Sequence, residues 1–407
     1  MNEVVLGSVV FIVIVLVLCS VILLAQSVLL PTGSVTVRIN DQQDITARAG
    51  DRLLTALTDR GIAVPSACGG AGTCGQCRMF IGKNRSPPLP TEAAILSRAE
   101  LASGLRLACQ TTLRSNISVT LPKCILTAQT WDCTVISSRT IAPIIRELVL
   151  APSGGTAFTF EPGAFVQIEA PAYDLAFADY DIAPPHRSAW DHQGLDELRA
   201  QSKGGVSRAY SIANNALADA GKIVLLVRLA LPPPQHSDAP PGVVSSWLFG
   251  LREGERVSVT GPFSSFAAQT TEREMVFIGG GVGMAPLRAI ISDQLERRNT
   301  HRKMSFWYGA RSSVDLFYEQ EFEWLQAKHP NFRWTVALSD PTPEDNWQGE
   351  TGFIHEVALR KALAAHPAPH DCEYYLCGPP MMIKAVLAML DDLGVGPDQI
   401  FNDDFGG

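Results

Sequence analysis

Residues 68–77 read CGGAGTCGQC and place three cysteines within ten positions. Cys68, Cys74 and Cys77 have the spacing C-x5-C-x2-C, and Cys109 follows in the segment LRLACQ. Four thiolates can hold a [2Fe–2S] cluster, and the loop around such a cluster needs small residues so that backbone N–H groups can approach the sulfur atoms. The loop supplies such small residues at Gly69, Gly70, Ala71, Gly72, Thr73 and Gly75. The sequence therefore predicts a [2Fe–2S] centre with these four cysteines as its ligands.

Two other uses of the cysteines fit the pattern less well. A structural zinc ribbon normally has two C-x2-C pairs, and only one such pair is present. The chain has nine cysteines, an odd number in a protein that we expect in a reducing compartment, so a disulfide framework is not expected. Of the remaining cysteines, Cys19 lies in an apolar segment, and Cys124 and Cys133 are expected to be buried thiols.

The sequence on both sides of the cysteine loop predicts a small mixed domain. Alternating apolar and polar residues predict strands over 34–40, 45–49, 78–82, 105–108 and 117–121. Helices are expected from Asp51, as the capping residue, to Arg60 and over Thr91–Leu101. Together these elements predict a β-grasp domain over residues 33–123. Its cysteine loop resembles that of the adrenodoxin branch of the ferredoxins.

Upstream of this domain, Val4–Ala25 is an uncharged apolar run. A helix of this length would be about 33 Å long, enough to span a bilayer. A secretory signal peptide, the competing interpretation, has a basic start and a shorter apolar core, and no basic residue precedes this run. The sequence predicts a membrane anchor over 1–30. Arginines follow the run at Arg38, Arg48 and Arg52, which places the soluble part on the cytoplasmic side.

Downstream, β-rich segments separated by glycine and proline turns predict an antiparallel β-barrel over residues 128–270. Within it, Arg208-Ala-Tyr210-Ser211 matches the R-x-Y-S motif of the ferredoxin–NADP reductase superfamily. An arginine can pair with a diphosphate, a tyrosine ring can pack against an isoalloxazine, and a serine hydroxyl can bond the flavin N5 edge. The later stretch GVVSSWL resembles the same family's helix start, where backbone N–H groups hold the FAD pyrophosphate. It contributes Gly242, Ser245 and Ser246 to the predicted FAD site.

The last third of the chain, residues 271–407, predicts a doubly wound parallel sheet that binds a nicotinamide dinucleotide. The expected buried strand Glu274–Ile278 leads into GGGVGMAP and then into a helical pattern, and a strand, a glycine turn and a helix form a phosphate site. The residues of this turn are Gly279, Gly281, Gly283 and Pro286. Near the end, Cys377, Gly378 and Pro379 match the superfamily's C-G-P-P at the nicotinamide pocket. Ser211 and Cys377 are the expected catalytic residues.

Composition bounds the remaining possibilities. The length of 407 residues predicts two to three domains, and a net charge of −8 without a basic run makes nucleic acid a poor partner.

The segment near 171–205 is longer than a simple connection between barrel strands. His366 and His370 lie in the proline-rich stretch HPAPH, which indicates a loop more than a metal site. No second metal is predicted.

In this order, the anchor, ferredoxin-like domain, FAD barrel and nicotinamide domain resemble the F subunits of the sodium-translocating NADH:quinone oxidoreductases. The resemblance covers the whole chain, including the 171–205 insertion. It implies a single-pass inner-membrane protein that accepts hydride from NADH on FAD and passes single electrons through the cluster to membrane partner subunits. Quinone would be reduced only indirectly, by those partners. The tail resembles the family's, and Phe405 would stack on the flavin as a movable lid.

Two rival functions differ in class. Reductase components of monooxygenases share the order of ferredoxin, FAD and nicotinamide domains, but they generally lack the anchor and the long insertion. A non-catalytic membrane scaffold with degenerate redox folds is the second alternative. The intact cysteines, R-x-Y-S motif and glycine turn count against the scaffold.

Overall fold

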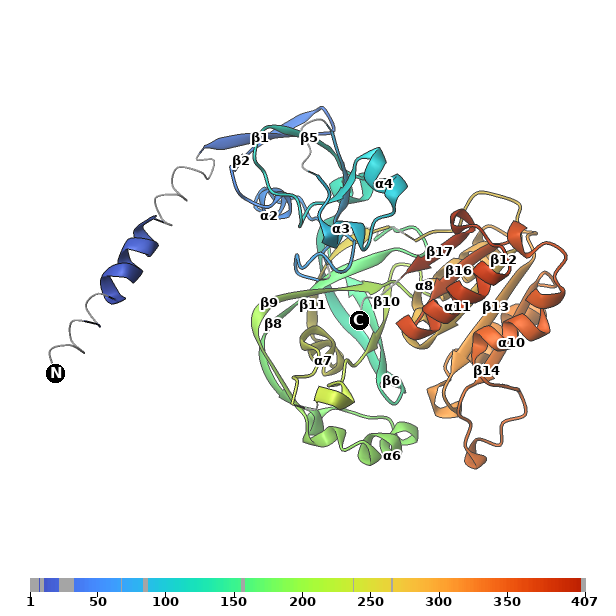
Figure 1. Cartoon of the computed structure of the whole chain (residues 1–407). Helices are drawn as coiled ribbons and strands as arrows, with labels where there is room; N and C mark the ends of the chain where they lie inside the picture. Colours follow the sequence, from blue (N-terminus) through green and yellow to red (C-terminus); the bar gives the residue numbers. More distant parts are fainter. Residues whose placement is uncertain are drawn as a thin grey trace. The chain divides into compact units, whose positions relative to one another are not determined.

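The computed structural model describes residues 7, 11–21, 33–66, 68–82, 87–154, 158–236, 238–264 and 266–403. The chain forms two compact units (Figure 1). The first comprises Met1–Val64 and Gly70–Leu126, and the second comprises Pro65–Gly69 and Thr127–Gly407.

Near the N-terminus, residues 11–21 are helical and exposed. Within the described part of the chain, no helix combines the length and the apolar character that crossing a bilayer requires. Most of the predicted anchor over 1–30, namely residues 1–6, 8–10 and 22–30, lies outside the described residues.

The first unit is built on a five-stranded mixed sheet in the order β2-β1-β5-β3-β4. Its strands are β1 (Ser34–Ile39), β2 (Gln43–Arg48), β3 (Arg78–Ile81), β4 (Leu105–Leu107) and β5 (Ile117–Thr120). The helices of this unit are α2 (Leu53–Thr58), α3 (Pro90–Ala93), α4 (Arg98–Ser103) and α5 (Lys123–Thr127). Val37 and Leu57 are among the fully buried residues of its core. All five predicted strands are confirmed.

Two helix predictions in this unit need correction. The single helix expected over Thr91–Leu101 is two short helices, because Ser97 accepts a hydrogen bond from the Glu100 N–H and starts α4 with a capping box. Asp51 does not cap α2, whose N-cap is Arg52. The Asp51 carbonyl accepts instead from the Leu113 N–H at 2.9 Å, which ties this segment to a distant part of the chain.

The second unit begins with a six-stranded antiparallel sheet in the order β10-β7-β6-β11-β8-β9. Its strands are β6 (Gln129–Ala142), β7 (Ile145–Pro152), β8 (Phe165–Ala176), β9 (Arg199–Ser211), β10 (Ile223–Arg228) and β11 (Arg256–Phe263). A bridge between Ile212 and Leu225 joins the two edges of the sheet, as the predicted barrel requires. Helix α7 (Val243–Phe249) packs on this sheet, and Cys133 in β6 is buried as predicted. Cys124, by contrast, is only half-buried.

The 171–205 segment forms the outer end of the long β8–β9 hairpin. Its two arms stay paired through Ala172↔Lys203 to Ala176↔Arg199, and α6 (Pro184–His192) lies between them in the chain. Figure 1 shows α6 in green beside α7. This segment has a core of its own around Phe177, Tyr180 and Trp190, which the barrel residue Phe249 completes.

The rest of the second unit is a parallel sheet in the order β15-β14-β13-β12-β16-β17, as predicted. The strands are β12 (Met275–Gly280), β13 (Met304–Ala310), β14 (Phe332–Leu338), β15 (Glu350–Thr351), β16 (Glu373–Cys377) and β17 (Ile400–Asp403). The helices are α8 (Met284–Ser292), α9 (Glu319–Lys328), α10 (Ile354–Lys361) and α11 (Pro380–Asp392). Both faces of the sheet are covered, since Phe277 of β12 packs in one core and Ile278 in another.

Candidate functional site

The cysteine loop brings thiols together just before β3 begins, where Cys77 interacts with Cys109 and Cys74. Cys77 and Cys109 are buried, with exposed fractions of 1% and 3%, and Cys74 is half-buried. The neighbouring Cys109 thiol and burial together raise the pKa of the Cys77 thiol far above its ordinary value. Cys68 lies in the turn that leads into this loop.

The glycines of the loop are needed for its turns. Gly69, Gly70, Gly72 and Gly75 all have positive φ, between 63° and 92°, where side chains are strained. A Cβ on Gly72 would come within 2.6 Å of the Gln110 amide nitrogen. The loop therefore wraps tightly and leaves backbone groups near the thiols, which fits the predicted cluster.

The second unit contains a cavity of about 960 Å³. Its walls come from both the barrel and the parallel sheet. Among the predicted site residues, the cavity is lined by Arg208, Tyr210, Ser211, Gly242, Ser245, Gly281, Gly378 and Pro379. A cavity of this size suits a dinucleotide-sized ligand with a second ligand beside it.

On the barrel side, β9 carries the R-x-Y-S motif along the cavity. The Arg208 side chain is exposed, and no carboxylate pairs with it among the residues that the structure describes. Burial raises the pKa of Tyr210, so its phenol stays neutral beside any bound ring. The Arg208 guanidinium, which has no carboxylate partner there, fits the diphosphate of a flavin dinucleotide. The Tyr210 ring, two positions along the strand, fits the flavin ring.

At the start of α7, Ser245 and Ser246 have different surroundings. Ser245 Oγ accepts from the Ala230 N–H at 3.2 Å and donates to the Gly242 carbonyl at 3.1 Å, which fixes the turn before the helix. Ser246 Oγ is fully buried and has no hydrogen-bond partner in the described part of the chain. A buried hydroxyl without a partner costs free energy. Ser246 is not among the residues that line the cavity.

The predicted glycines of the turn after β12 have two different roles, one in lining the cavity and one in packing. Gly281 has a φ of +56°, lines the cavity, and has open space where a side chain would be. Gly279 and Gly283 do not line the cavity. A Cβ on Gly283 would lie 2.0 Å from the Cys377 carbonyl oxygen, so this glycine permits close packing of α8 on β16. Pro286 is buried in the first turn of α8.

Cys377 ends β16 and is fully buried, while Gly378 and Pro379 continue into the cavity wall. Ser211 Oγ donates to Asp403 Oδ2 at 3.0 Å, and Asp403 is paired with Cys377 in the β16–β17 register. This contact joins the barrel motif to the end of the chain. Asp403 was not predicted, because no pattern in FNDDFGG distinguishes it. Phe405, the predicted lid, lies outside the described residues.

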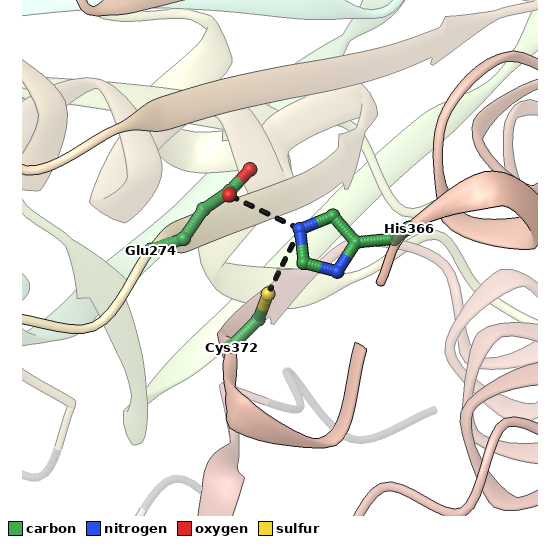
Figure 2. A group of neighbouring side chains, drawn as sticks. All are labelled: Glu274, His366 and Cys372. Atoms are coloured by element: carbon green, nitrogen blue, oxygen red, sulfur yellow. Dashed lines mark hydrogen bonds and ion pairs between the residues drawn. The ribbon is translucent and has the colours of Figure 1, made fainter. Parts of the chain in front are cut away.

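A cluster away from the cavity contains Glu274, His366 and Cys372 (Figure 2). His366 Nε2 lies 3.2 Å from Glu274 Oε2, and Nδ1 accepts from the Ala368 N–H at 3.2 Å. The ring proton is therefore on Nε2, which donates to Glu274, and Lys303 Nζ bonds the same carboxylate oxygen at 3.0 Å. A metal ion bound to Nε2 would force the ring proton onto Nδ1, where it would face the Ala368 N–H and two donors would oppose each other. The geometry thus fits a hydrogen-bonded loop anchor, in keeping with the loop predicted for HPAPH.

Three family models match the chain. The 2Fe-2S iron-sulfur cluster binding domain matches residues 37–114, the oxidoreductase FAD-binding domain matches 197–267, and the oxidoreductase NAD-binding domain matches 277–388. The chain therefore has domains for a [2Fe–2S] cluster, FAD and a nicotinamide nucleotide, as the motifs predicted.

Two solved structures share this arrangement. The Amycolatopsis cytochrome P450 reductase GcoB is 26% identical with a TM-score of 0.61, and the match covers 91% of this chain and 98% of that one. The ferredoxin reductase of carbazole 1,9a-dioxygenase is 25% identical with a TM-score of 0.57, and the match covers 92% and 98%.

Curated relatives match over the full length of both chains. The F subunit of the Na(+)-translocating NADH-quinone reductase of Yersinia pseudotuberculosis is 50% identical over 407 residues, and that of Serratia proteamaculans is 49% identical over 407 residues. Each match covers 100% of this chain and 100% of the relative. This chain therefore belongs to the family of the F subunits of Na(+)-translocating NADH-quinone reductases.

Proposed function

We propose that this protein is the NADH-oxidising subunit of a sodium-translocating NADH:quinone reductase. It takes electrons from NADH and passes them to membrane-bound partner subunits. The observation that carries the proposal is the cavity whose walls combine the R-x-Y-S strand with the glycine turn, in a chain that also has a [2Fe–2S] domain. When bound, FAD accepts a hydride and releases electrons singly, and a [2Fe–2S] cluster carries one electron at a time.

The barrel side of the cavity holds FAD in this proposal. Arg208 pairs with the diphosphate, Tyr210 packs on the flavin ring, and Ser211 presents its hydroxyl to the N5 edge. Gly242 and Ser245 shape the start of α7 so that its backbone N–H groups face the phosphates, with Ser246 behind them. The unpaired Arg208 guanidinium on the cavity wall supports this assignment.

The sheet side of the cavity holds NADH. Gly281 leaves its backbone open to the dinucleotide phosphates, while Gly279, Gly283 and Pro286 set the close packing that positions α8. Gly378 and Pro379 form the wall of the nicotinamide pocket. Cys377 is buried behind these two residues, and its role is to position the segment Gly378–Pro379. Phe405 would cover the flavin face until NADH displaces it.

Cys68, Cys74, Cys77 and Cys109 hold the cluster in this proposal. A single N-terminal helix in the inner membrane anchors the chain, with both units on the cytoplasmic side. Sodium movement and quinone reduction belong to the partner subunits, since the apolar run 4–25 has no Asp, Glu, Lys, Arg or His to form an ion path.

The chain isolated through an affinity tag from its native membrane tests this function. We expect it to bring down other membrane subunits and to reduce quinone with NADH faster when sodium is present. Co-isolation with an oxygenase component, and no quinone reduction, would instead support the monooxygenase-reductase alternative. A preparation without flavin or cluster absorbance would contradict both.

A further inference from the structure

We propose that the 171–205 insertion is part of the FAD site: it places Gln193 against the adenosine end of FAD and braces helix α7. The inference rests on the proposed function, in which the cavity of the second unit holds FAD. Gln193 is an exposed residue at the C-terminal end of α6, and it lines the same cavity as Arg208 and Tyr210.

The order of residues along β9 indicates that the adenosine of FAD lies near the insertion. Ser211 is at the flavin end of the strand, and Arg208 lies three residues before it, or about 10 Å away at the rise of a strand. The insertion lies at the opposite end, where β9 begins at Arg199. In FAD the diphosphate separates flavin from adenosine. With the diphosphate at Arg208, the adenosine therefore extends toward the insertion.

The chemistry of Gln193 suits adenine. A glutamine amide offers a donor and an acceptor side by side, which is the pattern that the adenine N6 and N7 atoms complement. No hydrogen bond within the described residues occupies this amide. The side chain is therefore available to a ligand in the cavity.

The insertion also holds the carbonyl groups of the first turns of α7. Tyr173 Oη donates to the Val243 carbonyl at 2.5 Å, and Tyr180 Oη donates to the Ser246 carbonyl at 2.9 Å. A helix of seven residues is marginal by itself, so its position depends on such packing. The insertion thus fixes the helix start that faces the FAD phosphates.

Aromatic packing makes the insertion and α7 one rigid piece. The Trp190 ring stacks on Phe249 at 5.8 Å and 21°, and the Tyr180 ring lies 5.7 Å from the same residue. Arg146 of the barrel covers Phe249 at 4.7 Å and donates to the Asp181 carbonyl. The insertion is therefore anchored to the barrel through the helix that it braces.

Equilibrium binding of FAD and of FMN to flavin-stripped full-length protein tests the proposal. FMN lacks the adenosine, so Gln193→Ala is expected to weaken FAD binding about tenfold and to leave FMN binding unchanged. Gln201→Ala, an exposed glutamine on β9 in the same insertion, is the matched control and should bind both flavins normally. Tyr180→Phe removes the brace and should weaken FAD and FMN alike, by about tenfold or less.

Unchanged FAD binding in Gln193→Ala, or equal losses of FAD and FMN, would overturn the adenosine assignment. Normal binding of both flavins in Tyr180→Phe would overturn the brace. A wild-type protein that binds no FAD would instead overturn the proposed function, so the two failures can be told apart. Far-ultraviolet circular dichroism and the thermal unfolding midpoint of every variant report whether its second unit has folded.

Discussion

Arg208 is the residue on which the FAD assignment depends most, because it is a cavity-lining cation without a carboxylate partner in the described part of the chain. We predict that Arg208→Leu weakens the binding free energy of FAD by roughly 2–5 kcal/mol, since a desolvated phosphate is left unpaired. Flavin content after gel filtration measures the loss. Arg199→Leu, on the same strand but paired with Asp174, is the control and should keep its flavin.

Asp403 is expected to orient the Ser211 hydroxyl through their 3.0 Å hydrogen bond. Asp403→Ala removes the acceptor and should slow flavin reduction by NADH about tenfold, the equivalent of one hydrogen bond of roughly 1.4 kcal/mol, while FAD stays bound. Stopped-flow absorbance under anaerobic conditions gives this rate. An unchanged rate at full flavin occupancy would show that the contact only closes the end of the chain onto the barrel.

Cys109 is the proposed cluster ligand most distant in sequence from the other three. Cys109→Ala should abolish the iron–sulfur absorbance and leave FAD bound and reducible by NADH, because the flavin cavity belongs to the second unit. Cys133→Ala, which removes a buried thiol from β6, is the control and should retain the cluster. A cluster signal in Cys109→Ala would exclude this ligand set.

The motifs correctly predicted several of the residues that line the cavity. They did not distinguish these residues from others whose role is to pack the elements around it. Arg208, Tyr210 and Gly281 line the cavity as their motifs suggest. Gly283 matches the same motif but packs against the Cys377 carbonyl. Gln193 and Asp403 carry no sequence signal, because the hairpin and the last strand bring them to the site only through tertiary folding.

Among the structural elements, α3 and β4 are joined by a buried ion pair. Arg106 Nε donates to Glu92 Oε1 at 2.9 Å, and both side chains are almost fully buried. Burial alone would raise the pKa of Glu92, but Arg106 and the backbone N–H groups of Leu89 and Leu107 outweigh it and lower the pKa. A lowered pKa means that the ionised carboxylate stabilises the folded state.

This pair gives a pH prediction for the first unit. Its contribution is complete above the ordinary carboxyl pKa of about 4.3 and is lost as the pH falls through the lower folded value. Glu92→Gln should destabilise the unit by about 3–5 kcal/mol at neutral pH, because the buried Arg106 charge loses the carboxylate that neutralises it. Thermal unfolding followed by circular dichroism should show this difference shrinking below about pH 4. A difference that is constant with pH would rule out the ion pair as its cause.

Strands were easier to predict than helices because their alternating pattern repeats over few residues. All five predicted strands of the first unit are present. The helix expected over Thr91–Leu101 breaks instead, since Ser97 and Glu100 form a capping box inside the apparent periodicity. The α6 insertion could be recognised by its length alone, because its aromatic core is completed by Phe249 from a later helix.

For the whole molecule, the order of domains decides the function, and the N-terminal segment should serve only to anchor it. Deletion of residues 1–30 is expected to give a soluble protein that reduces ferricyanide with NADH at the full rate. The physical reason is that every predicted cofactor site lies beyond Gly33. Loss of this activity in a truncated protein that retains its flavin and cluster would mean that the segment does more than anchor.

Anaerobic mixing of the full-length protein with NADH, followed by absorbance and electron paramagnetic resonance, follows electrons from the nucleotide to the cluster. We expect the flavin absorbance to bleach first and the signal of a reduced [2Fe–2S] cluster to follow. In Arg208→Leu depleted of FAD the cluster should stay oxidised, and added FAD in excess should restore its reduction. Rapid reduction of the cluster by NADH without FAD, or none in the fully loaded protein, would contradict the proposed electron path.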